Sequence, residues 1–289
     1  MRVLIIGASG LIGGAILVEF SDHQQTMGTY NSFPVEGLTR VDISDLEAIR
    51  RLTEQFGPEV ILQPAALTDV NYCESHPDEC WRINVDGTRS IAEAASRLGA
   101  RHVFFSTEYV FDGRAGPYSE EDAPNPISVY GRSKLAAEDA MRQVTNNHLI
   151  IRTTAVYGWE RQGNNFVVRL LRGVREGKRV AVPTDQITSP TYAPNLAQAV
   201  RELVESDACG IYNVAGPDIV DRYSFAVATA RIFGFPIDLI KPVVTTELNQ
   251  AARRPLRAGL KVDKAQRKLS TSLQGVEAGL TAMREEQPR

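Results

Sequence analysis

Tyr130 and Lys134 stand four residues apart, in a stretch whose pattern becomes helical just after two prolines. That spacing places both side chains on one face of a helix. An ammonium close to a phenol favours the phenolate, so we expect Lys134 to lower the pKa of Tyr130 from its usual value of about 10. A tyrosine tuned in this way can pass a proton near neutral pH. The pair is therefore a candidate for general acid–base catalysis.

The elements that must position this pair alternate between short apolar runs and longer helical patterns. Strands separated by helices of ten or more residues imply parallel pairing through crossover connections. The predicted fold is α/β, a doubly wound parallel sheet of the Rossmann type. The expected strands are 2–6, 26–30, 60–63, 102–106 and 148–152, and the expected helices are 11–20, 45–56 with Ser44 as its cap, 77–98 and 129–144.

Three glycines follow the first expected strand and open the first expected helix. A turn without side-chain bulk lets the backbone approach a pyrophosphate, and the helix start offers unpaired N–H groups to the anion. A tight turn without a ligand is the alternative. The sequence therefore predicts a dinucleotide site, with contacts from Gly7, Ser9, Gly10, Leu11, Ile12 and Gly13.

The end of the second expected strand bears on the choice of cofactor. An acidic residue there would bind a ribose 2′-hydroxyl and favour NAD. Tyr30 and Asn31 stand there instead, with neither an acid nor an arginine beside them, so a 2′-phosphate meets no repulsion. We expect Asp42 and Ile43 to flank the adenine of the cofactor. The alternative is that Asp42 is only a turn residue. NADP(H) is favoured, and NAD(H) stays open.

The pattern changes after Gly158. Helices are expected at 165–176, 195–205 and 221–233, strands at 179–182 and 210–214, and a proline-bearing loop at 185–194. The strand at 210–214 can return to the first sheet. We predict a dinucleotide-binding domain over residues 1–160, completed by 186–216, and a smaller C-terminal substrate-binding lobe of 161–185 and 217–289.

Composition limits the class of protein. With 289 residues, 43% of them hydrophobic, the chain can bury a sizeable core. A net charge of −3 gives no bulk attraction to nucleic acid or anionic lipid. Because no apolar run approaches the ~20 residues of a membrane span, we expect a cytoplasmic protein. Cys73, His76 and Cys80 match no common zinc spacing, so no metal is predicted.

Ser106 and Thr107 place hydroxyls at the end of a buried expected strand, where ligands of open α/β sheets bind, although strand-end capping is an alternative role. With the glycine turn, the run at 84–88 and the Tyr130/Lys134 pair, they make the chain resemble the extended short-chain dehydrogenase/reductases. Within that superfamily it is similar to the dTDP-4-dehydrorhamnose reductase family. The segments that carry this similarity are 106–113, 152–158, 164–166, 185–191 and 253–260.

The resemblance implies an NAD(P)H-dependent reduction of the C4 carbonyl of a nucleotide-linked 6-deoxy-4-keto sugar. Tyr130 would protonate the developing alkoxide, and Lys134 would bind the nicotinamide ribose. Thr107 would hydrogen-bond the carbonyl oxygen, with Ser106 as the second candidate. The other implied contacts are Ala65, Ala66 and Leu67 and residues 153–155 for the cofactor, and Arg253 or Arg254 for the substrate pyrophosphate, unless these arginines belong to a solvated basic tail.

Three departures from the family pattern lie on the substrate side. Glu108 stands where the family has aspartate, Ala155 where an aromatic residue is frequent, and Ala258 where a serine is expected. The identity of the sugar is therefore open. Two other functions also stay open: a nucleotide-sugar epimerase or dehydratase that recycles NAD, and a non-catalytic regulatory subunit like that of methionine adenosyltransferase. The oligomeric state is undetermined, with a homodimer among the expectations.

Overall fold

Seven parallel strands form the central sheet of the computed structural model, which describes residues 1–287. Their order is β11-β6-β5-β4-β1-β2-β3, so the direction of strand addition reverses between β1 and β4 and opens a crevice beyond their carboxyl ends. The prediction of a doubly wound parallel sheet is confirmed. The strands are β1 (Arg2–Ile5), β2 (Gln25–Tyr30), β3 (Thr39–Arg40), β4 (Val60–Gln63), β5 (Arg101–Thr107), β6 (His148–Thr153) and β11 (Gly210–Asn213).

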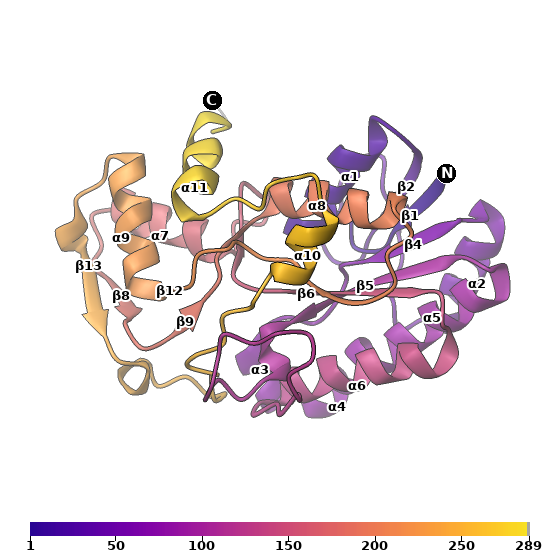
Figure 1. Cartoon of the computed structure of the whole chain (residues 1–289), viewed down its shortest axis with the longest axis horizontal. Coiled ribbons are helices and arrows are strands. Elements are labelled where there is room, and N and C mark those ends of the chain that lie inside the picture. Colours follow the sequence, from indigo (N-terminus) through magenta and orange to yellow (C-terminus); the bar gives the residue numbers. More distant parts are fainter. Residues whose placement is uncertain (288–289) are drawn as a thin grey trace.

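Helices cover both faces of this sheet (Figure 1). On one face lie α1 (Leu11–Ser21) and α8 (Ala193–Glu205), which pack against each other. On the other lie α2 (Leu46–Phe56), α5 (Gly87–Leu98) and α6 (Val129–Val144). Within residues 1–287, no helix combines the length and the apolar character that crossing a membrane requires.

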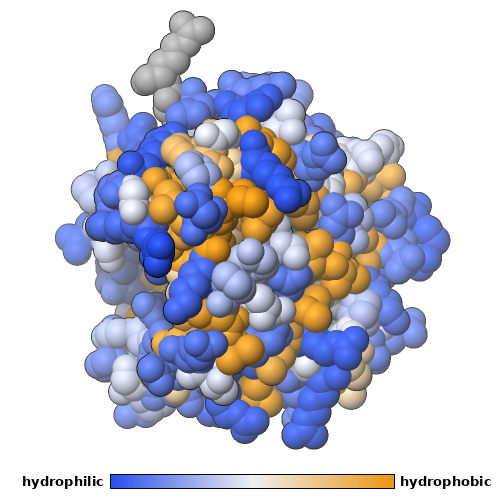
Figure 2. Space-filling view, turned by 90° about the vertical axis from the view of Figure 1, so that its left-hand side faces the viewer, coloured by the Kyte–Doolittle hydropathy of each residue, from blue (hydrophilic) through white to orange (hydrophobic). Residues whose placement is uncertain are grey.

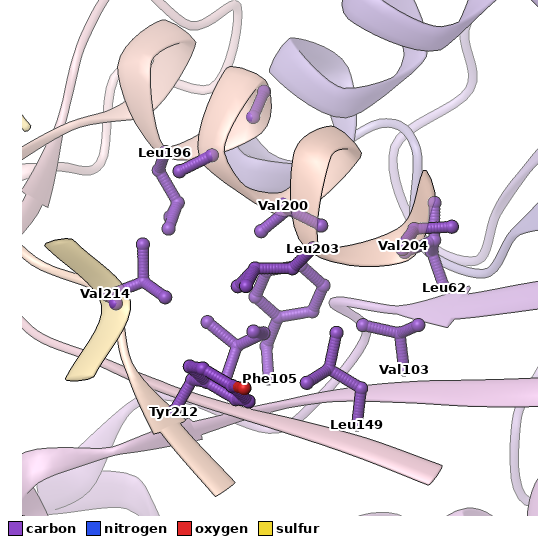
Figure 3. Close-up of a cluster of buried hydrophobic side chains, with 14 of the residues drawn as sticks. Leu62, Val103, Phe105, Leu149, Leu196, Val200, Leu203, Val204, Tyr212 and Val214 are labelled. Carbon is purple, nitrogen blue, oxygen red and sulfur yellow. The ribbon is translucent and has the colours of Figure 1, made fainter. Parts of the chain in front are cut away.

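The apolar core beneath α8 explains why strands and helix stay together. Every residue of β5 is buried, as expected for a strand covered on both faces. Side chains of α8 meet the apolar side chains of four strands in Figure 3. The labelled residues of α8 are Leu196, Val200, Leu203 and Val204, and those of the strands are Leu62, Val103, Phe105, Leu149 and Tyr212.

A second lobe occupies the other end of the molecule (Figure 1). Its helices α7 (Phe166–Arg175), α9 (Arg222–Phe233) and α11 (Val276–Glu285) pack with the parallel pair of β8 (Val180–Pro183) and β13 (Ile240–Val243). Figure 2 faces this end of the molecule and shows apolar side chains at the surface among polar ones.

Two short strand pairs lie where the lobe meets the sheet. β7 (Val156–Tyr157) runs parallel to β10 (Thr191–Tyr192), and β9 (Ile187–Thr188) runs antiparallel to β12 (Val220–Asp221). Residues 187–188 thus pair with the second lobe, whereas 193–213 return to the sheet. The division of the chain into 1–160 with 186–216, and 161–185 with 217–289, stays a prediction.

The end of α11 is tied to the segment that follows β7 and to β10. Trp159 Nε1 donates to the carbonyl of Met283 at 2.6 Å, and the Tyr192 hydroxyl donates to the Glu286 carboxylate at 2.6 Å. The side chain of any residue larger than glycine at position 279 would meet the Tyr157 hydroxyl, since a Cβ there would lie 2.2 Å from it. The last helix therefore packs tightly against the wall formed by residues 157–159.

Most of the expected strands and helices are present in the structure. Where an expected boundary or cap differs, the difference has a physical reason. Asp45, not Ser44, caps α2, because its carboxylate accepts from the N–H of Ala48 at 2.9 Å. The expected loop at 185–194 contains β9, β10 and the start of α8, because two-residue strands leave no periodic pattern. The smaller elements are α3 (Val70–Ser75), α4 (Pro77–Trp81), the π-helix Arg82–Asp86, α10 (Asp263–Lys268) and the 3₁₀ turns Glu108–Val110, Ile237–Leu239 and Thr245–Leu248.

A buried ion pair joins α6 to the sheet. Arg152, on β6, donates to both carboxylate oxygens of Glu138, at 3.0 Å from Nε and 2.7 Å from Nη2. Ser106, on β5, donates to the same carboxylate at 2.5 Å. The side chains of Arg152 and Glu138 are 2% and 0% exposed. Three bonds to one carboxylate therefore hold α6 in a single position over β5 and β6.

We expect Arg152→Met to lower the free energy of unfolding by about 3–5 kcal/mol, because it leaves Glu138 as an unpaired buried charge. The double variant Arg152→Met/Glu138→Leu should recover most of this loss, because no charge then remains. Urea titration measures both effects. Arg50→Met, in an exposed pair with Glu47, is the control and should change little. A single variant as stable as the wild type would contradict the role given to the pair.

Candidate active site

A cavity of about 790 Å³ opens at the carboxyl ends of the strands, at the point where the sheet order reverses. It brings together residues that are distant in the sequence. Of the residues singled out above, those that line it are Gly7, Ser9, Gly10, Leu11, Ile12, Gly13, Tyr30, Asn31, Asp42, Ile43, Ala65, Ala66, Leu67, Ser106, Thr107, Glu108, Tyr130, Lys134, Thr153, Thr154 and Ala155.

The glycine turn at one end of the cavity has the geometry of an anion cradle. Gly7 has a φ of +99°, and a Cβ on it would lie 2.8 Å from that of Ala65. A Cβ on Gly13 would lie 2.1 Å from the carbonyl oxygen of Gly7. No side chain caps the start of α1 after Gly10, so its first N–H groups are not satisfied by a cap. These features fit a bound pyrophosphate, and a Cβ on Gly10 would meet only the Gly7 carbonyl oxygen, at 3.6 Å.

The adenosine end of the cavity contains a cation that sequence reasoning missed. No acid follows β2, as expected. Asp42 lines the cavity and is also a turn residue, since its Oδ1 accepts from the N–H and hydroxyl of Ser44, both at 2.8 Å. Arg82, from the π-helix, also lines the cavity and donates to the Ser44 hydroxyl at 3.2 Å. A guanidinium therefore stands near the place where a 2′-phosphate would lie.

The candidate reaction centre is formed by α6 and β5. Ser128 caps α6 by accepting from the N–H of Gly131 at 3.1 Å, and Tyr130 and Lys134 follow on the buried side of the helix. They are 8% and 2% exposed. Thr107 ends β5, and its hydroxyl donates to Glu108 at 2.9 Å. The cavity therefore receives a phenol, an ammonium and a hydroxyl from two neighbouring elements.

The hydroxyl of Ser106 is directed elsewhere. It donates to Glu138, within the buried ion pair. Thr107 thus keeps the role of carbonyl-binding candidate. The hydroxyl of Thr153 is buried and has no hydrogen-bond partner among residues 1–287, although Thr153 lines the cavity. An unpaired buried hydroxyl fits a polar ligand group such as the carboxamide of a nicotinamide.

The expectation that Lys134 lowers the pKa of Tyr130 is wrong for this structure. Burial raises the pKa of Tyr130, and the nearby charge of Glu108 adds to that rise. Burial also lowers the pKa of Lys134 to about 7, opposed by Glu138 and Cys80. Helix spacing placed both groups on the same buried side of α6, but the loss of hydration there dominates the pKa of each.

The substrate side of the cavity contains the departures from the family pattern. Glu108 is buried, and this burial raises the pKa of its carboxyl above the usual range. Ala155 has a φ of +43°, unusual for a residue other than glycine.

Arg254 does not line the cavity. It donates to Asn71 at 2.9 Å and Gln250 at 3.2 Å, and its guanidinium lies 5.9 Å from the ring of Tyr109, which does.

Two further parts of the wall were not identified from the sequence. Arg222, at the start of α9, lines the cavity, as do several residues of the segment after β7. In that segment Gln162 donates to the carbonyl of Ser9 at 3.2 Å, which brings the second lobe onto the glycine turn. The sequence did offer one signal for Arg222. Asp221 is a recognisable helix cap, so Arg222 could be placed at the start of a helix.

Comparisons with known proteins agree with this geometry. The family model of the RmlD substrate binding domain matches residues 1–288. The dTDP-4-dehydrorhamnose reductase of Escherichia coli (strain K12) is 32% identical over 295 residues, which cover 98% of this chain and 97% of that protein. The methionine adenosyltransferase 2 subunit beta of Bos taurus is 31% identical over 269 residues, 90% of this chain and 80% of that protein.

A solved structure shares the whole fold. The crystal structure of dTDP-4-dehydrorhamnose reductase from Bacillus anthracis in complex with NADP superposes with a TM-score of 0.92. Its sequence is 29% identical, and the superposition covers 99% of each chain. The expected resemblance to dTDP-4-dehydrorhamnose reductase is thus confirmed in both sequence and structure.

The buried ammonium of Lys134 should cost stability. Its pKa is about 7 in the folded chain against about 10.5 when unfolded, so the unfolded chain binds more protons between these values. The cost is present in full below pH 7 and fades as the pH rises towards 10. We expect Lys134→Met to raise the free energy of unfolding at pH 6 by roughly 2–5 kcal/mol.

Urea titration from pH 6 to pH 9 measures this difference. The gain should shrink at the upper end of the range. Lys268→Met, which changes an exposed lysine of α10, is the control and should leave stability unchanged at every pH. A Lys134→Met variant less stable than the wild type at pH 6 would contradict the expectation.

Proposed function

The chain belongs to the RmlD substrate binding domain family, and from this membership we propose that it reduces the 4-keto group of a nucleotide-linked 6-deoxy sugar with NADPH. The observation that carries the proposal is the convergence of Thr107, Tyr130 and Lys134 on the cavity that also contains the glycine turn. A glycine turn alone would support only nucleotide binding. The hydroxyl, phenol and ammonium at the far end add the groups that a carbonyl reduction needs.

Each residue has a role that follows from its chemistry. Bound NADPH supplies a hydride to the carbonyl carbon. Tyr130 gives its proton to the carbonyl oxygen, and the burial that raises its pKa keeps the phenol protonated until that oxygen becomes basic. Thr107 holds the carbonyl oxygen beside Tyr130. Lys134 binds the nicotinamide ribose, whose hydroxyls can accept from an ammonium.

NADP is favoured over NAD on two grounds. The end of β2 has no carboxylate to repel a 2′-phosphate, and Arg82 stands at the same end of the cavity. The B. anthracis relative is a complex with NADP. We infer that Arg82, Tyr30 and Asn31 surround the 2′-phosphate, with Ala65, Ala66 and Leu67 along the rest of the cofactor.

The sequence similarity to methionine adenosyltransferase 2 subunit beta gives the second candidate function. In that case the chain would bind the dinucleotide and serve as a subunit of another enzyme. The conjunction of Thr107, Tyr130 and Lys134 favours the reductase, since a purely regulatory protein has no need of a proton donor at the end of its cavity. An epimerase or dehydratase would instead retain NAD through purification.

Gly10→Ala tests the cofactor site. A Cβ at Gly10 makes only an ordinary contact, 3.6 Å from the Gly7 carbonyl, so the variant should fold normally while its methyl group intrudes on the pyrophosphate. We expect the affinity for NADP⁺ to fall roughly 10- to 100-fold in calorimetric titrations. Gly14→Ala has the same clearance of 3.6 Å, lies outside this cavity, and should bind normally. Equal binding by both variants would contradict the assignment.

Tyr130→Phe tests the reaction. With NADPH and dTDP-4-keto-6-deoxy-L-mannose, the wild type should consume the absorbance of the reduced nicotinamide. The variant should turn over roughly 10²- to 10⁴-fold more slowly, because a positioned acid is lost, and should bind NADP⁺ as before. Tyr212→Phe changes a buried tyrosine of β11 outside the cavity and is the control. Wild-type protein inactive on a panel of nucleotide-linked keto sugars, with either cofactor, would refute the reductase proposal.

A further inference from the structure

The substrate side of the cavity presents an arginine whose guanidinium has no polar partner among residues 1–287. The backbone N–H of Arg222 donates to the carbonyl of Gln186 at 2.9 Å, which fixes the start of α9. The side chain lines the cavity and its guanidinium lies 5.0 Å from the centre of the Phe166 ring. None of the hydrogen bonds or salt bridges of the described residues involves that guanidinium. A partly buried group with five donors is therefore available to a ligand.

Strand pairing places Arg222 on a part of the cavity wall that comes from the second lobe. Arg222 directly follows β12, and β12 pairs with β9. Thr188 of β9 shares a hydrogen bond of 2.5 Å with Thr154, the neighbour of Ala155. Arg222 thus belongs to the wall of the second lobe, whereas Tyr130 and Thr107 belong to the sheet and its helix. A ligand in this cavity would therefore contact groups from the sheet and from the second lobe.

A second guanidinium approaches the same region. Arg254 and Arg222 both act on Tyr109, where each lowers the pKa of a phenol that burial raises. Arg254 is held by Asn71 and Gln250, so its position is set without a ligand. Burial raises the pKa of the Glu108 carboxyl and so favours its neutral form, and the charge of Arg222 opposes that rise. Two guanidinium groups therefore lie near Tyr109, and Arg222 is the one that lines the cavity.

The chemistry of the proposed substrate explains what this charge would bind. In a pyranose the C4 carbonyl and the C1 carbon that carries the diphosphate lie on opposite sides of the ring. When C4 is at Tyr130, the diphosphate must lie about one ring width away, in the cavity that the side chain of Arg222 also lines. Guanidinium groups match phosphate oxygens in pairs of parallel hydrogen bonds.

We propose that Arg222 binds the diphosphate of the nucleotide sugar. This inference rests on the proposed function, because it takes a nucleotide sugar as the substrate. It adds a residue to the substrate site and makes Arg222 a determinant of specificity for diphosphate-linked sugars. Free sugars and sugar monophosphates lack the group that would reach it.

Binding is the direct test, because it needs no turnover. dTDP and UDP are titrated calorimetrically into the full-length chain saturated with NADP⁺, with thymidine and uridine as ligands that lack phosphate. Arg222→Ala should weaken the affinity for the preferred diphosphate roughly 10- to 100-fold, and Arg222→Lys should recover part of it as a point charge. Arg231→Ala, on the exposed face of the same helix, is the matched control and should bind like the wild type.

The outcomes separate the two proposals. Unchanged diphosphate affinity in Arg222→Ala overturns the inference, as does a loss that appears equally with the nucleosides. Normal diphosphate binding with slowed turnover also overturns it, since Arg222 would then contact the sugar. If the wild type binds neither diphosphate, the inference fails. Turnover of the keto sugar by the same preparation then reports separately on the reductase proposal.

Discussion

The carboxylate of Glu138 is the point on which the reaction centre depends. It is buried between α6, which carries Tyr130 and Lys134, and the strands that carry Ser106 and Arg152. Thr107 and Thr153 are the next residues on those two strands. Glu138 also lies one helical turn beyond Lys134 and favours its charged form. One buried anion thus sets both the positions of the catalytic groups and part of their electrostatics.

Burial opposes charge throughout this site. The same loss of water raises the pKa of Tyr130 and Glu108 and lowers that of Lys134. All three groups are therefore shifted towards their neutral forms. For Tyr130 this means that the phenol keeps its proton until a substrate oxygen accepts it. The ion pair of Arg152 and Glu138 is the counterexample, because two charges that satisfy each other can stay buried.

The parts of the fold that depend on local patterns could be predicted from the sequence. The glycine turn, the buried strand β5 and the bounds of α6 all follow from neighbouring residues. The position of Arg222 could not, because it depends on pairing between β9 and β12, which lie more than thirty residues apart and have two residues each. The pKa of Tyr130 was mispredicted for a related reason: helix spacing shows which groups are neighbours, but not how much water they lose.

The contact between Trp159 and Met283 has a consequence for how the protein is made. Synthesis proceeds from the N-terminus, so the glycine turn, β5 and α6 leave the ribosome long before α11. The segment after β7, which closes over the glycine turn through Gln162, is braced by that final helix. A nascent chain can therefore form the glycine turn and its neighbouring strands early. The segment that lies over the glycine turn takes its final position only when α11 has been translated and has packed against it.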